Sequence, residues 1–167
     1  MEVKATVQLT AKQMFEFLMH HTYSSMNGII GVILSILGYA GFVYMLFVPD
    51  VSEVYLVALL FIGLLFTVIQ PLMIYSRSKR QVKTNESINK PFEYVISQRG
   101  VDISQDGQKG FTPWEEIIKI TSSRNNIMFY TSRVHAYVFP KQEIGQQMEE
   151  LKTLVRENST ARYIKIK

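Results

Sequence analysis

The chain has 167 residues, with 18 Lys and Arg against 14 Asp and Glu, which gives a formal net charge of +4 at pH 7. It contains no cysteine, which excludes disulfides, thiolate metal sites and a cysteine nucleophile. Apolar residues are concentrated in about a third of the length, which leaves room for one small domain beside that apolar segment.

The N-terminal residues 1–22 predict a strand followed by an amphipathic helix. Over residues 1–9, Val3, Ala5, Val7 and Leu9 alternate with polar residues, which is the period of a half-buried strand. Thr10 and Gln13 have the spacing of a capping box, so a short helix should follow. This helix either lies along the inner membrane surface or packs on its own domain. We expect the strand to pair with an open edge of the sheet formed later in the chain, and so to join the soluble domain.

Two apolar runs, residues 26–48 and 54–75, contain no charged residue. As helices they would be roughly 33 to 35 Å long, enough for a hydrocarbon core of about 30 Å. The break between them holds Pro49, Asp50 and Glu53, which fits a tight turn. Residues 26–75 are therefore predicted to form a transmembrane helical hairpin, and no cleavage site marks a signal peptide. The alternative is a buried helical pair in a soluble protein.

Charge asymmetry predicts the orientation of this hairpin. Five basic residues and a single acidic one, Glu86, lie between Arg77 and Lys90, whereas the turn has no Lys or Arg. Basic flanks stay cytoplasmic, so a multi-pass protein of the plasma membrane with both termini inside is expected. The same cluster predicts a site for anionic lipid or a partner, formed by Arg77, Lys79, Arg80 and Lys83.

Polar residues within the two runs are few and none is ionisable, so transport by this chain alone is not expected. Gly31 with Ser35, and Gly63 with Thr67, are small residues four positions apart, which allow close helix approach. They serve either the packing of the hairpin's own helices or contact with a second membrane protein.

Residues 76–91 read as a basic polar linker, and residues 92–157 as a small domain. Six strands are expected, with turns at Arg99-Gly100, Asp106-Gly107 and Arg124–Asn126, and one of the strands should cover 115–122. An amphipathic helix follows over 141–157. Residues 158–167 form a polar tail with a last extended piece near Tyr163. The fold class is therefore an α+β membrane protein, in which a two-helix transmembrane hairpin is joined to a small antiparallel β sheet or barrel capped by a C-terminal helix.

The residue types do not point to an enzyme. His135 is expected in the middle of a strand, without a nucleophile or acid at a useful spacing. Glu115 and Glu116 are neighbours and should face opposite sides of a strand, which is unsuitable for a carboxylate pair. Trp114, the single tryptophan, is either a buried anchor or an exposed binding aromatic. No cofactor and no metal is expected. Nucleic-acid binding is not expected either, because residues 92–167 carry 11 basic against 9 acidic residues.

The segments FEYVISQRGVDIS, GFTPWEEIIKI and MFYTSRVHAYVFPKQEI follow the two apolar runs and the basic linker. In this order the chain resembles the YcxB-like family of bacterial membrane proteins, most specifically at Trp114-Glu115 and Phe139-Pro140-Lys141. The resemblance implies a pleckstrin-homology-like (PH-like) domain, a curved sheet or barrel capped by a C-terminal helix. It supplies no catalytic residues.

These observations predict a non-enzymatic, membrane-anchored interaction or regulatory module that presents a cytoplasmic PH-like domain to a protein partner or to anionic lipid. The alternative is an accessory or immunity subunit whose hairpin binds a larger membrane protein, such as a transporter or toxin target. The expected partners are the lipid bilayer and a membrane or cytoplasmic protein, and a homo-oligomer is left open.

Overall fold

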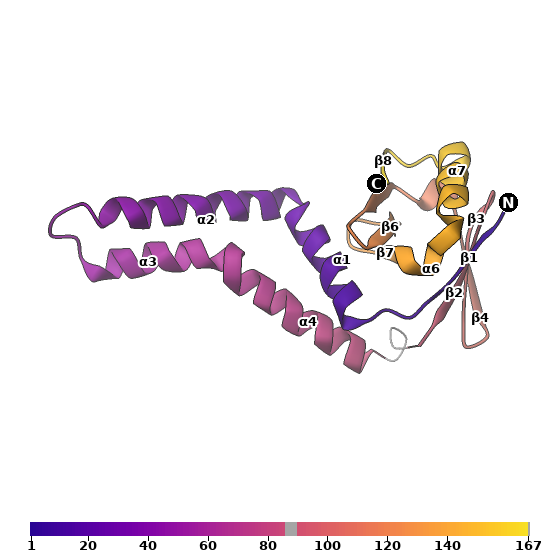
Figure 1. Ribbon diagram of the computed structural model, residues 1–167, viewed down its shortest axis with the longest axis horizontal. Helices are drawn as coiled ribbons and strands as arrows, with labels where there is room; N and C mark the ends of the chain where they lie inside the picture. Colours follow the sequence, from indigo (N-terminus) through magenta and orange to yellow (C-terminus); the bar gives the residue numbers. More distant parts are fainter. Residues whose placement is uncertain (86–89, 167) are drawn as a thin grey trace. The chain divides into compact units, whose positions relative to one another are not determined.

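The computed structural model describes residues 1–85 and 90–166. It confirms a mixed fold of helices and sheets with two apolar helices long enough to cross a membrane (Figure 1). The chain forms two compact units, one made of Met1–Phe17 and Gln81–Lys167 and the other of Leu18–Arg80. We call them the sheet unit and the hairpin unit. Residues 86–89 of the predicted linker, including Glu86, and Lys167 of the predicted tail lie outside the described residues.

The first sheet contains the N-terminal strand. β1 (Val3–Val7), β2 (Phe92–Ser97), β3 (Gly100–Gln105) and β4 (Gln108–Pro113) follow one another across it in the order β1-β2-β3-β4, all antiparallel. β1 lies against β2 with Val3 opposite Ile96 and Val7 opposite Phe92. Val3, Ala5 and Val7 are buried, because side chains two residues apart share one face of a strand.

The outer edge of β1 is covered by the amide of Gln147. The Lys4 N–H donates to Gln147 Oε1 at 3.0 Å, and Gln147 Nε2 donates to the Lys4 carbonyl at 3.2 Å. One side-chain amide thus pairs both backbone groups that a further strand would have used at this position.

The second sheet contains β5 (Lys119–Ser122), β6 (Asn126–Tyr130), β7 (Ala136–Pro140) and β8 (Tyr163–Lys165), in the order β7-β6-β5-β8, with β8 parallel to β5. The strands thus form two sheets, one of them with a parallel pair, where the sequence predicted a small antiparallel sheet or barrel. A 3₁₀ turn, η2 (Trp114–Glu116), divides the strands into two sets where a strand over 115–122 was expected. His135 lies exposed in the loop before β7 and not in the middle of a strand.

The core of the sheet unit contains residues from both sheets and from the C-terminal helices. Trp114 is 2% exposed, and its indole N–H donates to the Ser97 carbonyl at 3.0 Å, so this residue is a buried anchor. The predicted helix over 141–157 is divided into α6 (Lys141–Ile144), the 3₁₀ turn η3 (Gly145–Gln147) and α7 (Met148–Asn158). Gly145 has φ of 53°, a backbone conformation that breaks the helix and favours glycine. α7 buries Leu151 and Leu154 in the core.

Helix α1 (Ala11–Tyr23) begins with the predicted capping box. The Thr10 N–H donates to Gln13 Oε1 at 2.8 Å, and the Gln13 N–H donates to Thr10 Oγ1 at 3.3 Å. The first part of α1 packs on the sheet unit. Glu16 accepts hydrogen bonds from Asn125 at 2.6 Å and from Asn126 at 3.3 Å.

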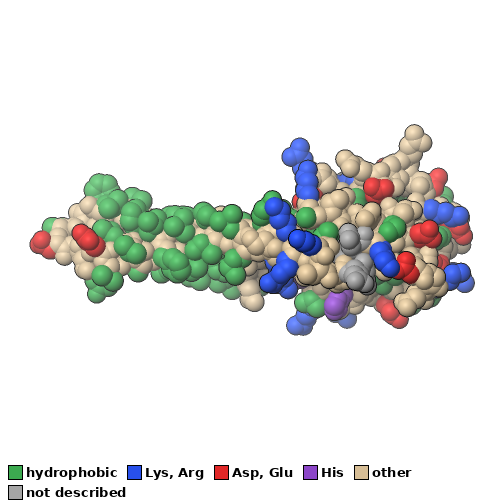
Figure 2. Space-filling model, turned by 90° about the horizontal axis from the view of Figure 1, so that it is seen from below, with side chains coloured by type: hydrophobic (Ala, Val, Ile, Leu, Met, Phe, Trp, Pro, Cys, Tyr) green, Lys and Arg blue, Asp and Glu red, His purple; other side chains and the backbone are tan. Residues whose placement is uncertain are grey.

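The hairpin is formed by α2 (Met26–Met45) and by a long second helix that runs from Glu53 to Thr84. The second helix comprises α3 (Glu53–Leu64), the π-helical turn η1 (Leu65–Ile69) and α4 (Gln70–Thr84). The predicted linker is thus helical as far as Thr84, because Arg, Lys and Gln favour helix even where apolar periodicity ends. Figure 2 shows apolar side chains along the surface of the hairpin.

Small residues bring the two hairpin helices together. Gly31, Ser35 and Gly38 are buried along one face of α2. A Cβ at Gly31 would lie 2.2 Å from the Phe66 ring, and one at Gly63 would lie 2.6 Å from the Tyr39 ring. The small-residue pairs expected from the sequence therefore serve the packing of the hairpin itself.

The π-helical turn has a local cause in Pro71 and is supported by polar side chains. The Gln70 N–H donates to the Leu65 carbonyl, and Pro71 has no N–H, so neither residue donates to the Phe66 carbonyl as a regular helix would. The Tyr23 hydroxyl donates to this carbonyl instead. Ser35 Oγ accepts from the Phe66 N–H at 3.3 Å and donates to the Ile62 carbonyl at 3.2 Å.

Candidate functional site

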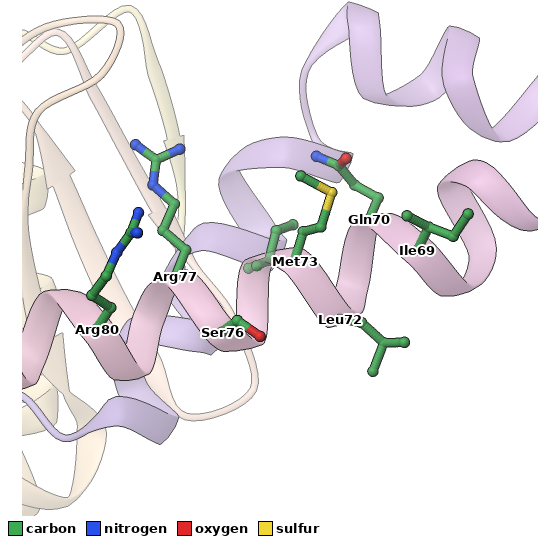
Figure 3. Close-up of a pocket in the computed structure, with 8 residues that line it drawn as sticks. Ile69, Gln70, Leu72, Met73, Ser76, Arg77 and Arg80 are labelled. Carbon is green, nitrogen blue, oxygen red and sulfur yellow. The ribbon is translucent and has the colours of Figure 1, made fainter.

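The candidate site is a groove on α4, where the apolar part of the helix meets its basic end. The groove has a volume of about 600 Å³. Its lining runs from apolar residues at the end of the π-helical turn to two arginines and consists of Ile69, Gln70, Leu72, Met73, Ile74, Ser76, Arg77 and Arg80 (Figure 3).

Helical spacing places the two arginines next to each other. Arg77 and Arg80 are three residues apart, and Met73 is one turn before Arg77, so their side chains are neighbours on the helix surface. Figure 3 shows the two guanidinium groups extending to the same side of α4 as Met73 and Gln70, while Leu72 and Ser76 extend to the other side. The groove is thus apolar at one end and cationic at the other.

The rotation of α4 about its axis is set by a second, buried face. Ile74 and Ser78 are four residues apart and both buried, and Ser78 Oγ donates to the Tyr75 carbonyl at 2.8 Å. Leu72, Met73 and Arg77 are exposed. The buried pair therefore turns the groove residues outward.

The structure separates the four predicted site residues into two pairs. Arg77 and Arg80 line the groove, whereas Lys79 and Lys83 are exposed outside it. The Lys79 ammonium lies 4.6 Å from the centroid of the Tyr75 ring, a cation–π distance. Lys83 lies in the last turn of α4, where a positive charge interacts favourably with the helix dipole.

The arrangement is suited to binding an anion that carries an apolar group. Guanidinium groups bind phosphate and carboxylate through two parallel N–H donors and keep their charge over the physiological pH range. None of the lining residues is a histidine, an acid or a cysteine. Within residues 1–85 and 90–166, no three His, Asp or Glu side chains are grouped so that they could hold a metal ion.

Sequence reasoning identified the basic residues but not the apolar end of the groove. Ile69, Leu72 and Met73 belong to the predicted span and carry no signal that separates them from its other apolar residues. A signal was present in their register with the arginines, because Ile69, Met73 and Arg77 follow one another at intervals of four.

The other candidate residues lie in the sheet unit. Glu115 and Glu116 are exposed in η2, and His135 is exposed in the loop before β7. A smaller hollow of about 280 Å³ on the first sheet is lined by Glu93, Asp102 and Lys109, among others.

No curated protein and no solved structure matches the chain. Residues 96–155 match the family described as YcxB-like protein. This segment extends from β2 into α7 and contains Trp114-Glu115 and Phe139-Pro140-Lys141. The match over residues 96–155 confirms the resemblance to the YcxB-like family that the sequence showed.

Proposed function

We propose that the protein is a non-enzymatic, membrane-anchored interaction module. Its hairpin spans the plasma membrane, and the sheet unit is presented at the cytoplasmic surface to a protein partner or to anionic lipid. One observation carries this proposal: the long apolar helix that starts at Glu53 ends, without interruption, in the exposed cations Arg77, Lys79, Arg80 and Lys83. A helix with this order of residues fits the hydrocarbon core with one part and the headgroup layer with the next.

The exposure of the hairpin favours a membrane over a soluble helical pair. In an apolar stretch of 18 residues in α2 only 22% is buried, and in a stretch of the same length in the second helix only 11% is buried. Large apolar side chains such as Leu37 (61% exposed) and Val57 (67%) face outward. An apolar surface of this extent is unfavourable in water, whereas lipid tails would cover it.

The PH-like domain is part of this proposal. Its support is the pair of four-stranded sheets, together with α7, whose Leu151, Leu154 and Val155 lie in the same core. PH-like folds serve several kinds of binding, so the fold does not choose between lipid and protein. The accessory-subunit alternative lacks support from the small residues, because Gly31 and Gly63 already contact the hairpin's own side chains.

Thiol labelling tests the topology, because the chain has no cysteine of its own. Single cysteines are introduced at Asp50, Lys4 and Lys109, and intact cells are treated with a membrane-impermeant thiol reagent. We expect labelling at position 50 only, and labelling at all three positions after lysis. Labelling at position 4 or 109 in intact cells would contradict the proposed orientation.

A further inference from the structure

We propose that the α4 groove binds one anionic glycerophospholipid, with the lipid phosphate between the Arg77 and Arg80 guanidinium groups and an acyl chain along Met73 and Ile69. The inference rests on the proposed function, because a bilayer lipid reaches this groove only if α4 lies at the membrane surface. It goes further in naming a single bound lipid at a defined place, where the proposed function needs only a general attraction between basic residues and the membrane.

The apolar end of the groove positions the lipid but does not select it. Met73 is 62% exposed, and Ile69, one turn before it, is partly exposed, so both offer surface to an acyl chain. A chain that leaves the bilayer interior for this surface exchanges one apolar environment for another, with little hydrophobic gain. Selection among lipids must therefore come from the headgroup end.

The headgroup end has the chemistry of a phosphate site. Arg77 and Arg80 are neighbours on one helix and both line the groove, so two forked donors can bind the oxygens of one phosphate. Gln70 extends to the same side and adds an amide that can donate to the ester oxygens of the lipid. The headgroup of phosphatidylcholine brings a cation close to two arginines, whereas the glycerol headgroup of phosphatidylglycerol does not.

The two lysines differ from the arginines in both place and geometry. Lys79 lies over the Tyr75 ring, and neither Lys79 nor Lys83 lines the groove. They attract anionic membrane in a diffuse, salt-screened way that depends on charge alone. A bound lipid and a diffuse attraction therefore respond differently to matched substitutions.

The experiment titrates the full-length protein in detergent micelles with dioleoyl phosphatidylglycerol and counts retained lipids by native mass spectrometry. One double variant, Arg77→Lys with Arg80→Lys, keeps the charge but loses the forked donors. The control, Lys79→Gln with Lys83→Gln, removes two charges and leaves the groove intact. Fluorescence of Trp114 and circular dichroism, which report the sheet unit and the helices respectively, verify that both variants are folded.

We expect the wild type to retain one phosphatidylglycerol. The apparent affinity should stay within about twofold in the Lys79→Gln, Lys83→Gln control and fall tenfold or more in the Arg77→Lys, Arg80→Lys variant. Dioleoyl phosphatidylcholine should bind at least tenfold more weakly, and millimolar inorganic phosphate should not displace the lipid. Diffuse attraction depends on charge alone, so a loss in the Lys79→Gln, Lys83→Gln variant that equals or exceeds the loss in the Arg77→Lys, Arg80→Lys variant would overturn the inference. Displacement by inorganic phosphate would mean an ion site and would overturn it as well.

Thiol labelling of the same variants separates this inference from the proposed function. If position 50 alone is labelled while the lipid titration fails, the membrane-anchored module stands and the lipid site is wrong. If position 4 or 109 is labelled in intact cells, the orientation on which both depend is wrong.

Discussion

The contribution of β1 to the sheet unit can be measured by shortening its two buried valines. Val3 is 0% exposed and Val7 is 1% exposed, and they lie opposite Ile96 and Phe92 of β2. Replacing either valine with alanine removes two carbon atoms from a close-packed core. We therefore expect each substitution to destabilise the sheet unit, although both lie 80 or more residues before the rest of the sheet in the sequence.

The magnitude follows from the buried carbon atoms. At about 0.8 kcal/mol for each, plus a cavity term, Val3→Ala and Val7→Ala should each cost about 2 kcal/mol of unfolding free energy. The two positions are four residues apart on a strand, roughly 13 Å, so their effects should add to about 4 kcal/mol. For a domain of about 100 residues this lowers the melting temperature by at least about 15 °C.

Trp114 provides the assay, because the single tryptophan is buried in the sheet unit and its fluorescence follows the unfolding of that unit alone. The full-length protein in detergent is heated while Trp114 emission is recorded. Thr6→Val is the control, since Thr6 is an exposed β1 residue, and its melting temperature should stay close to that of the wild type. A double variant that melts within about 2 °C of the wild type would refute the account of β1 as part of the core.

Two further predictions concern the hairpin and the response to pH. Ser35→Ala leaves the Phe66 N–H without its side-chain acceptor and should destabilise the hairpin by about 1 kcal/mol. We expect faster amide exchange at residues 62–70 and no change at β2. Unchanged exchange at residues 62–70 would refute the role of Ser35. Burial, with the neighbouring Tyr137, raises the pKa of Tyr94 above the usual tyrosine value of about 10. Above pH 10 the unfolded chain therefore loses this proton while the folded chain keeps it, so the stability of the sheet unit should fall as the pH rises. Tyr94→Phe should flatten the fall in denaturant midpoint between pH 9.5 and 11.5, and an equally steep fall in that variant would contradict the assignment.

Local patterns predicted the parts of the fold in which one face of an element decides its packing. The alternation at Val3, Ala5 and Val7 predicted a strand with one buried face, and β1 has this burial pattern. The uncharged runs predicted two long apolar helices, because few other structures accommodate more than 20 such residues. The basic residues after Tyr75 were evident from charge alone.

Features that depend on distant partners could not be predicted in this way. The π-helical turn follows from Pro71, which is a local feature. The hydrogen bond from Tyr23 to the Phe66 carbonyl could not be predicted, because it depends on how another helix packs. The division into two sheets depends on Trp114, whose indole N–H reaches the Ser97 carbonyl and helps hold a 3₁₀ turn where strand propensity alone favours a strand. The end of the second helix was missed for another reason. Apolar periodicity stops near Tyr75, whereas helix propensity continues through the basic residues to Thr84.

Residues 1–23 combine a local sequence pattern with contacts to residues far along the chain. Val7 and Phe92 lie opposite each other in the first sheet, so the chain leaves this sheet and returns to it at adjacent positions, with the hairpin inserted between β1 and β2. α1 begins in the sheet unit, where Glu16 accepts from Asn125 and Asn126, and ends in the hairpin unit at Tyr23, which donates to the Phe66 carbonyl. Residues 1–23 are therefore structural parts of both units, and their removal would leave a sheet edge and a backbone carbonyl without partners.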